Sequence, residues 1–312
     1  MSWVLVAISA YLILAVANLL DKFLVDNVLP SGKAYAFVAC ILGALVTVAA
    51  PWFLVWPGLG LFLFNLLLGG IFAVALWLLY EALRRGEASR VLVFIGGTTP
   101  VFSLIFSLLF FKEHFTTSQW LGIASLLVGV FIIAFLPTSR SFLSRVMHKL
   151  KISQGELKTN SLLIAVFSAL AYSLYFIGSK YAYNTQPFGS VFIWTRLGSV
   201  LFVLLFLVRK KDRQEVISAL HQPNKNKNKW LVFFNQILGA SGFVLQNYAV
   251  FLGSVALVNA LQGVQYAFLL IISAILALLS PKLLKETFSW RIIIQKTLAI
   301  LIIGLGLYLI IF

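Results

Sequence analysis

Long apolar runs separated by short polar links dominate the chain. A helix that crosses a membrane needs about 20 mostly apolar residues. Runs of this kind occupy 3–22, 34–54, 60–83, 89–111, 118–136, 161–180, 188–208, 230–251, 254–279 and 292–311. The first run lacks the basic start and small-residue cleavage site of a signal peptide, so we expect it to be retained. The pattern predicts an all-α polytopic membrane protein with ten transmembrane helices.

Matching features recur in the same order in the two halves of the chain. The fourth and ninth runs are each followed by a Lys-Glu-X-Phe stretch, at 112–115 and 285–288. Tyr80 and Tyr248 lie near the ends of the third and eighth runs, and Lys22 and Lys180 close the first and sixth. Self-similarity of this kind is typical of duplication. We therefore expect two five-helix repeats, 1–137 and 161–312, joined by a basic linker at 138–160.

An odd number of spans in each repeat makes the second repeat enter the membrane in the opposite orientation. Nearly all lysines and arginines outside the runs lie in the odd-numbered links, while the even-numbered links hold Lys112 and Lys180. Basic links are retained in the cytoplasm. The sequence thus predicts inverted repeats with both termini outside.

Composition agrees with lipid as the solvent, since 61% of residues are hydrophobic and 11% are charged. A soluble domain is about half apolar and about a quarter charged. The net charge of +15 lies mostly in the links, where it favours contact with anionic lipid headgroups over nucleic acid. The single cysteine, Cys40, excludes an intramolecular disulfide framework. We expect a multi-pass protein of the plasma membrane, working as a monomer.

Several of these features together resemble a known family. The five-plus-five layout, the stretch Tyr80-Glu81-Ala82-Leu83, Pro100 in the fourth run, the following Lys112-Glu113 and the glycines Gly122 and Gly129 are similar to EamA-like members of the drug/metabolite transporter superfamily. The resemblance implies export or exchange of small organic solutes through a central cavity by alternating access. It does not indicate the substrate.

Arg196 is the charge placed deepest in an apolar run, near the middle of the seventh. A charged side chain at this depth costs at least about 2.5 kcal/mol on insertion scales and faces the protein interior. One interpretation is a structural ion pair or a cap on backbone carbonyls. The other is a cavity cation that meets an anionic group of the solute.

The eighth and ninth runs are unusually rich in amides. We take five of these amides, with the adjoining Tyr266, as candidate substrate-cavity residues: Asn235, Gln246, Asn259, Gln262 and Gln265. The three amides of the ninth run fan across about 120° of one helical face. Amides also join helices in membranes, but their number here favours a hydrogen-bonding cavity wall.

The first half offers fewer polar candidates for the cavity. Pro100 follows Gly96-Gly97-Thr98-Thr99 and removes a backbone hydrogen bond in the fourth run. The resulting kink is either a packing adaptation or a hinge that turns free carbonyls toward the cavity. Tyr80, at the end of the third run, is placed to add to the lining.

Charged groups at the ends of runs are candidates for gating or coupling. Glu81 is either an interfacial partner of Arg84 and Arg85 or a proton carrier. Lys22 and Lys180 are equally well explained as anchors at two helix ends or as two gates at opposite faces. Asn18 and Asp21 have no amide or acidic counterpart in the second half. If one side of the transport cycle uses an ion-paired gate, we therefore expect it on the side that holds Asp21 and Lys22.

Motifs of other chemistries are missing from the sequence. The histidines (His114, His148 and His221) lie in links without metal-ligand spacing, and no phosphate-binding glycine loop or serine elbow occurs. We predict no catalytic residues, metal or cofactor. The sequence favours a secondary active transporter, exporter or exchanger, of a small-molecule metabolite. The alternative is a membrane enzyme or accessory protein that acts on lipid-linked substrates.

Overall fold

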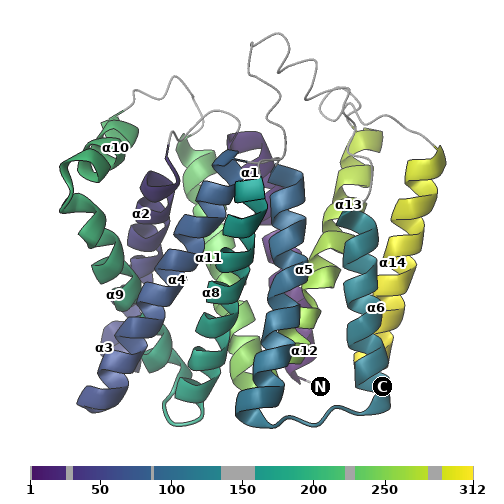
Figure 1. Ribbon diagram of the computed structural model, residues 1–312, viewed down its shortest axis with the longest axis horizontal. Helices are drawn as coiled ribbons and strands as arrows, with labels where there is room; N and C mark the ends of the chain where they lie inside the picture. The colour runs from purple at the N-terminus through teal and green to yellow at the C-terminus, as the bar shows by residue number, and fades with distance from the viewer. Residues whose placement is uncertain are drawn as a thin grey trace.

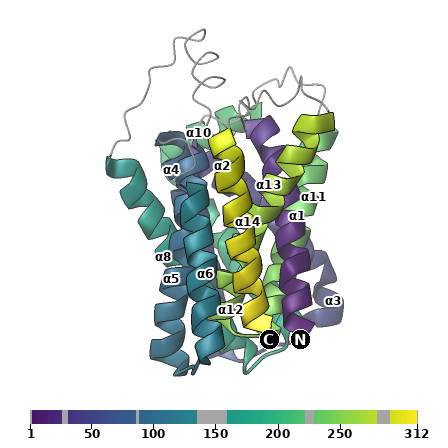
Figure 2. The same ribbon diagram turned by 90° about the vertical axis from the view of Figure 1, so that its right-hand side faces the viewer.

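The molecule is a bundle of helices that run roughly side by side (Figure 1). This computed structural model describes residues 2–25, 31–85, 88–134, 159–221, 229–279 and 290–311, and the secondary structure in these ranges is helical. Both termini lie at the same end of the bundle, in Figure 1 and in the perpendicular view of Figure 2. The all-helical architecture expected from the apolar runs is confirmed for these residues.

Apart from α10 (Lys210–His221), which lies in the polar link between the seventh and eighth runs, the helices follow the predicted runs to within a few residues at most boundaries. The first half contains α1 (Ser2–Val25), α2 (Gly32–Gly43), η1 (Ala44–Ala49), α3 (Ala50–Phe53), α4 (Leu59–Arg85), α5 (Ala88–Phe106), η2 (Ser107–Phe111) and α6 (Thr117–Ala134). The second contains α8 (Thr159–Tyr183), α9 (Phe188–Leu204), η3 (Leu205–Leu207), α10 (Lys210–His221), α11 (Lys229–Leu252), α12 (Val255–Ala260), α13 (Gln262–Leu279) and α14 (Trp290–Ile311).

Length and hydropathy confirm a polytopic membrane protein. Among the described residues, seven helical stretches are long and apolar enough to cross a membrane, and Thr117–Ile132 and Thr297–Ile311 are shorter apolar helices. The count of ten transmembrane helices stays a prediction. Most of the predicted linker 138–160 lies outside the described residues.

Two runs that the sequence presents as single spans are interrupted. The run at 34–54 passes from α2 through the 3-10 turn η1 into α3, where Thr47 Oγ1 donates to the Ala44 carbonyl (2.7 Å) and Pro51 begins the last turn. The run at 254–279 is divided at Leu261 between α12 and α13. Ser254 caps α12 by accepting a hydrogen bond from the Leu257 amide. Each stretch still contains enough apolar residues to cross a membrane, at Gly32–Phe53 and Val255–Ile272, so both remain candidate spans despite these local changes of helix type.

The two halves of the chain pack against each other in a reciprocal way. The first long helix of each half lies along the third of the other, so that α1 packs on α11 and α8 packs on α4. The last helices, α6 and α14, lie side by side (Figure 2). The helices are therefore interleaved, and the middle of the bundle is built from both halves.

Helices α4 and α9 cross at very short range because glycines face each other at the contact. A Cβ atom on Gly69 would lie 2.6 Å from the Ser199 amide nitrogen and 2.8 Å from the Gly198 carbonyl carbon. A Cβ atom on Gly198 would meet the backbone of Leu66. Small residues allow backbones to approach in this way inside membranes. The crossing therefore fixes the position of α9 around Gly198, including Arg196 two residues earlier.

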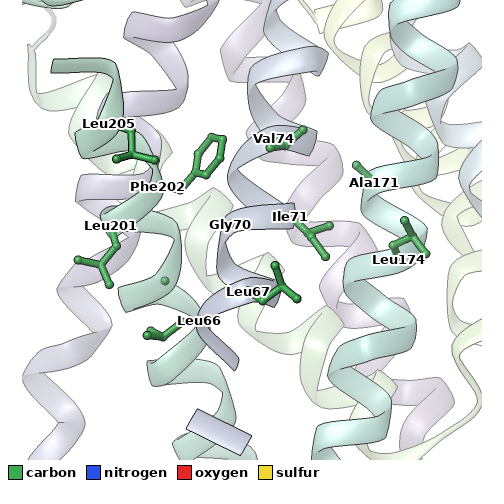
Figure 3. Close-up of a pocket in the computed structure, with 11 residues that line it drawn as sticks. Leu66, Leu67, Gly70, Ile71, Val74, Ala171, Leu174, Leu201, Phe202 and Leu205 are labelled. Carbon is green, nitrogen blue, oxygen red and sulfur yellow. The ribbon is translucent and has the colours of Figure 1, made fainter. Parts of the chain in front are cut away.

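An apolar groove of about 660 Å³ covers the outer side of this crossing, between α4, α8 and α9 (Figure 3). Its walls include Leu67, Leu201 and Leu205, each more than half exposed. The groove thus marks the face of α9 that turns outward, toward lipid. Arg196 and Ser199 are buried on the opposite side of the same helix.

Candidate functional site

Arg196 lies inside the bundle with its side chain enclosed by aromatic rings. Only 4% of the residue is exposed. The guanidinium carbon lies 3.8 Å from the ring centre of Phe72, 5.0 Å from Phe192, 5.1 Å from Phe243 and 5.6 Å from Tyr175. Rings at these distances stabilise a cation through their negative faces. They come from α4, α8, α9 and α11, so both halves enclose this charge.

A short chain of hydrogen bonds continues from the guanidinium. Nη2 of Arg196 donates to the Tyr175 hydroxyl (2.9 Å), which donates in turn to Oδ1 of Asn247 (2.9 Å). The Tyr183 hydroxyl donates to the same oxygen (3.3 Å), and Asn247 Nδ2 donates to the Phe243 carbonyl (2.9 Å). We call Arg196, Tyr175, Asn247 and the rings of Phe72, Phe192 and Phe243 the Arg196 cluster.

The charge of Arg196 is not neutralised by any acidic side chain that the structure describes. The described ion pairs are Lys33–Asp212 and the pairs of Glu81 with Arg84 and Arg85. Nε of Arg196 is buried and has no hydrogen-bond partner among the described residues. A buried donor without a partner is unfavourable by about 1–3 kcal/mol, and more when it is charged. The cluster therefore holds a cation with unused hydrogen-bonding capacity.

Two of the predicted cavity amides bond to different neighbouring helices. Asn259 Nδ2 donates to Ser103 Oγ on α5 (2.8 Å), while its Oδ1 is buried without a partner among the described residues. Gln246 Nε2 donates to the Tyr11 hydroxyl on α1 (3.3 Å), which donates to the Val258 carbonyl (2.7 Å). These contacts tie α11 and α12 to the first half.

The remaining amides are distributed along the same helices. Asn235 and Gln265 are buried, and Gln262 is partly exposed at the start of α13. Because α12 ends before Gln262, the amides of the ninth run do not lie on one uninterrupted helix. A common cavity wall stays a prediction.

Pro100 and Tyr266 lie near the same stretch of α5. Pro100 sits inside the helix, and the Thr98 hydroxyl donates to the Phe94 carbonyl (2.7 Å). The Tyr266 hydroxyl approaches Gly96 where a larger residue would carry its Cβ, and it donates to the Leu92 carbonyl (2.9 Å). Glycine at 96 is what lets α13 contact the backbone of α5.

Lys180 links two helices at the end of the bundle that holds the termini. Its Nζ donates to the carbonyls of Val250 (3.1 Å) and Phe251 (3.0 Å), at the carboxyl end of α11. Cations stabilise this end of a helix. Close by in sequence, Ser254 Oγ donates to Oε2 of Glu113 (2.5 Å). Lys180 thus joins α8 to α11, the first and third long helices of the second half.

At the opposite end of the bundle, where α10 lies (Figure 1), charged side chains link helices to one another. Lys33 Nζ on α2 lies 2.6 Å from Oδ1 of Asp212 on α10, and Ser31 Oγ donates to Oε2 of Glu215 (3.0 Å). Glu81 pairs with Arg84 and Arg85 at the end of α4. The start of α2 is therefore held to α10 by two contacts.

The structure gives fewer contacts for the other predicted gate and lining residues. Asn18 is half-buried on α1. Tyr80 packs against Tyr35 with ring centres 4.0 Å apart and ring planes tilted by 36°. Asp21 and Lys22 belong to α1, but their side chains lie outside the described part of the chain. Their proposed role as an ion-paired gate stays a prediction.

The Lys33–Asp212 pair is expected to contribute measurably to stability. In a double-mutant cycle of Lys33→Met and Asp212→Asn, we predict a coupling of about 1 kcal/mol in the unfolding of the detergent-solubilised protein, because both side chains are largely buried. Arg213→Gln is a matched control, since Arg213 is exposed on the same helix. A coupling near zero would show that the pair does not hold α2 to α10.

Several residues around Arg196 are not singled out by the sequence patterns. Tyr175 and Tyr183 lie on α8, together with the buried serines Ser168, Ser173 and Ser179. This series of polar positions in an apolar run is the signal that would have marked α8 as an inward-facing helix. Asn65, which the sequence offers as a further lining residue of the third run, donates from Nδ2 to Oε1 of Gln186 (2.8 Å) in a buried contact between the two halves.

An apolar exterior around a buried, charged and hydrogen-bonded interior defines a multi-pass integral membrane protein. The chain belongs to the EamA-like transporter family, which matches residues 1–135 and 159–312. It is thus a member of a family of membrane transporters, and the resemblance seen in the sequence is confirmed.

Individual relatives add less detail. The uncharacterized transporter YdfC of Bacillus subtilis (strain 168) is 31% identical over 113 residues, which cover 35% of this chain and 31% of that protein. The match therefore spans less than a third of that relative's length. A solved crystal structure of a protein is similar over 98% of this chain and 94% of its own, with a TM-score of 0.63 and 16% sequence identity. That similarity shows the fold alone.

Proposed function

We propose that this protein is a secondary active transporter that exports or exchanges a small organic metabolite by alternating access. The two halves, 1–137 and 161–312, would be inverted five-helix repeats that rock against each other around a binding site near the middle of the membrane. The reciprocal packing of α1 on α11 and of α8 on α4 supports this arrangement.

The Arg196 cluster is the observation that carries the proposal. A membrane protein that needs only stability has little reason to bury an arginine without an acidic partner, because such charges are unfavourable at this depth. Here the cation lies where helices of both halves meet, and its Nε is unused by the described residues. A solute that supplies an acceptor would complete the cluster.

The contacts at the two ends of the bundle support alternating access. Alternating access requires contacts that break at one end while those at the other end hold. The Lys33–Asp212 ion pair and the Ser31–Glu215 hydrogen bond join the start of α2 to α10 at one end. At the other end, Lys180 and the rings of Tyr183, Phe188 and Phe251 close the space between α8, α9 and α11. These are the candidate gates.

A flux measurement tests the proposed function. The purified chain is reconstituted in proteoliposomes and supplied in turn with labelled amino acids, sugars, organic acids and nucleotides. We expect saturable uptake or counterflow of at least one solute class above protein-free liposomes. If every class moves no faster than in protein-free liposomes, under both pH gradients and exchange conditions, the proposal is wrong.

A further inference from the structure

The Arg196 cluster also limits the chemistry of its ligand, and the inference drawn from this rests on the proposed function. We infer that the solute carries a single carboxylate group on an uncharged, apolar body. Three features of the cluster support this: its net charge, the donors it leaves free, and its walls.

The first feature is that the cluster holds one positive charge. Among the described residues, Arg196 is the one cation whose charge lies against the rings of Phe72 and Phe243. Lys180, on the same helix as Tyr175, uses its ammonium group on the carbonyls at the end of α11. One negative charge would neutralise the site, whereas a second would be buried without a partner.

The second feature is the free donor. Nη2 of Arg196 is oriented by the Tyr175 hydroxyl, and the neighbouring Nε has no described partner. A guanidinium presents parallel N–H groups that match the two oxygens of a carboxylate. A phosphate monoester carries about 1.5–2 negative charges at neutral pH and would exceed the single charge of the site. The donor set therefore favours a carboxylate.

The third feature is the apolar wall. Phe72, Phe192 and Phe243 surround the guanidinium, and Phe72 and Phe243 also contact each other with ring centres 5.0 Å apart. The nearby polar side chains, Tyr175 and Asn247, already hydrogen-bond to each other. A sugar or a polar amino-acid side chain would find few partners here. An apolar body would instead pack against the rings, while the carboxylate hydrogen-bonds to the guanidinium.

Ligand-induced thermal stabilisation of the detergent-solubilised protein tests the inference without requiring transport. Benzoate, phthalate, benzamide and benzylamine share one ring and differ in charge. We expect benzoate to raise Tm by at least about 2 °C in a saturable way, and the other three probes to have no saturable effect. Equal stabilisation by benzamide, stronger stabilisation by phthalate, or none by benzoate would overturn it.

A variant pair locates the effect. Arg196→Lys keeps the charge but loses the paired donors, so we expect benzoate affinity to fall at least about 10-fold. Arg209→Lys is the matched control, since Arg209 is exposed just beyond α9, and its affinity should equal that of the unchanged protein. Unchanged affinity in a monodisperse Arg196→Lys variant would also overturn the inference.

The two proposals fail in different ways. Saturable flux of neutral or cationic solutes, with no stabilisation by benzoate, would leave the transporter function standing and remove the carboxylate inference. Stabilisation by benzoate through Arg196, with no flux of any solute class, would support carboxylate binding at the Arg196 cluster and remove the transporter function.

Discussion

Replacing Gly69 with alanine is expected to destabilise the helix bundle strongly. The added methyl group would lie 2.6 Å from the Ser199 amide nitrogen and 2.8 Å from the Gly198 carbonyl carbon, which are backbone atoms that cannot move aside alone. Helices α4 and α9 would have to separate along their contact. Overpacking of side chains costs about 1–3 kcal/mol, and we expect at least the upper end here.

Gly70→Ala is the matched control for this substitution. It adds the same methyl group to the next residue of α4, where the nearest atom belongs to the Phe202 ring at 3.6 Å. We expect Gly69→Ala to give little monodisperse protein, or a Tm lower by at least about 6 °C. Gly70→Ala should stay within about 2 °C of the unchanged protein. Equal behaviour of the two variants would contradict the close crossing.

Much of the fold was predictable because lipid imposes a length on apolar helices. The run at 161–180 corresponds to α8 (Thr159–Tyr183), and the run at 60–83 corresponds to α4 (Leu59–Arg85). The interruptions were harder to predict. Leu261 is an ordinary apolar residue inside an apolar run, so composition gives no sign that the helix breaks there, although Thr47 and Pro51 do mark the weak second run.

The site was predictable only in part. Arg196 is visible in the sequence because a charge inside an apolar run is rare. Its partners are not visible, since Phe72 and Phe243 are distant in sequence and are brought to it by helix packing. The amides illustrate the same limit. Their helical spacing predicts a shared face, but the break at Leu261 and the contact of Asn259 with Ser103 depend on tertiary structure.

Arg196→Gln is expected to reduce transport sharply while leaving the bundle folded. Glutamine keeps a polar group of moderate length but removes the charge that the solute's carboxylate would meet. Loss of one member of a buried, hydrogen-bonded charge pair costs about 2–5 kcal/mol, which corresponds to a drop of at least about 30-fold in kcat/KM. We expect stability to change little, because the substitution removes an unfavourable buried charge together with the cation–π contacts that stabilise it.

Two further variants serve as controls. Arg209→Gln tests whether the loss of one positive charge alone affects transport, and Gln262→Ala tests whether the effect depends on the Arg196 cluster. Arg209 is exposed, so its neutralisation alters net charge by the same amount outside the bundle. Gln262 is a predicted cavity residue at the start of α13 that is not part of the Arg196 cluster. We expect transport by Arg209→Gln to match that of the unchanged protein and Gln262→Ala to show a smaller loss than Arg196→Gln.

The most direct test is counterflow of a labelled monocarboxylate into proteoliposomes that contain equal amounts of folded protein, unchanged or carrying Arg196→Gln. The account predicts saturable counterflow with the unchanged chain and a rate at least about 30-fold lower with the variant. If both proteins move the solute at the same rate, Arg196 is not the binding site. If neither moves any solute of the wider panel, the chain is not the transporter proposed.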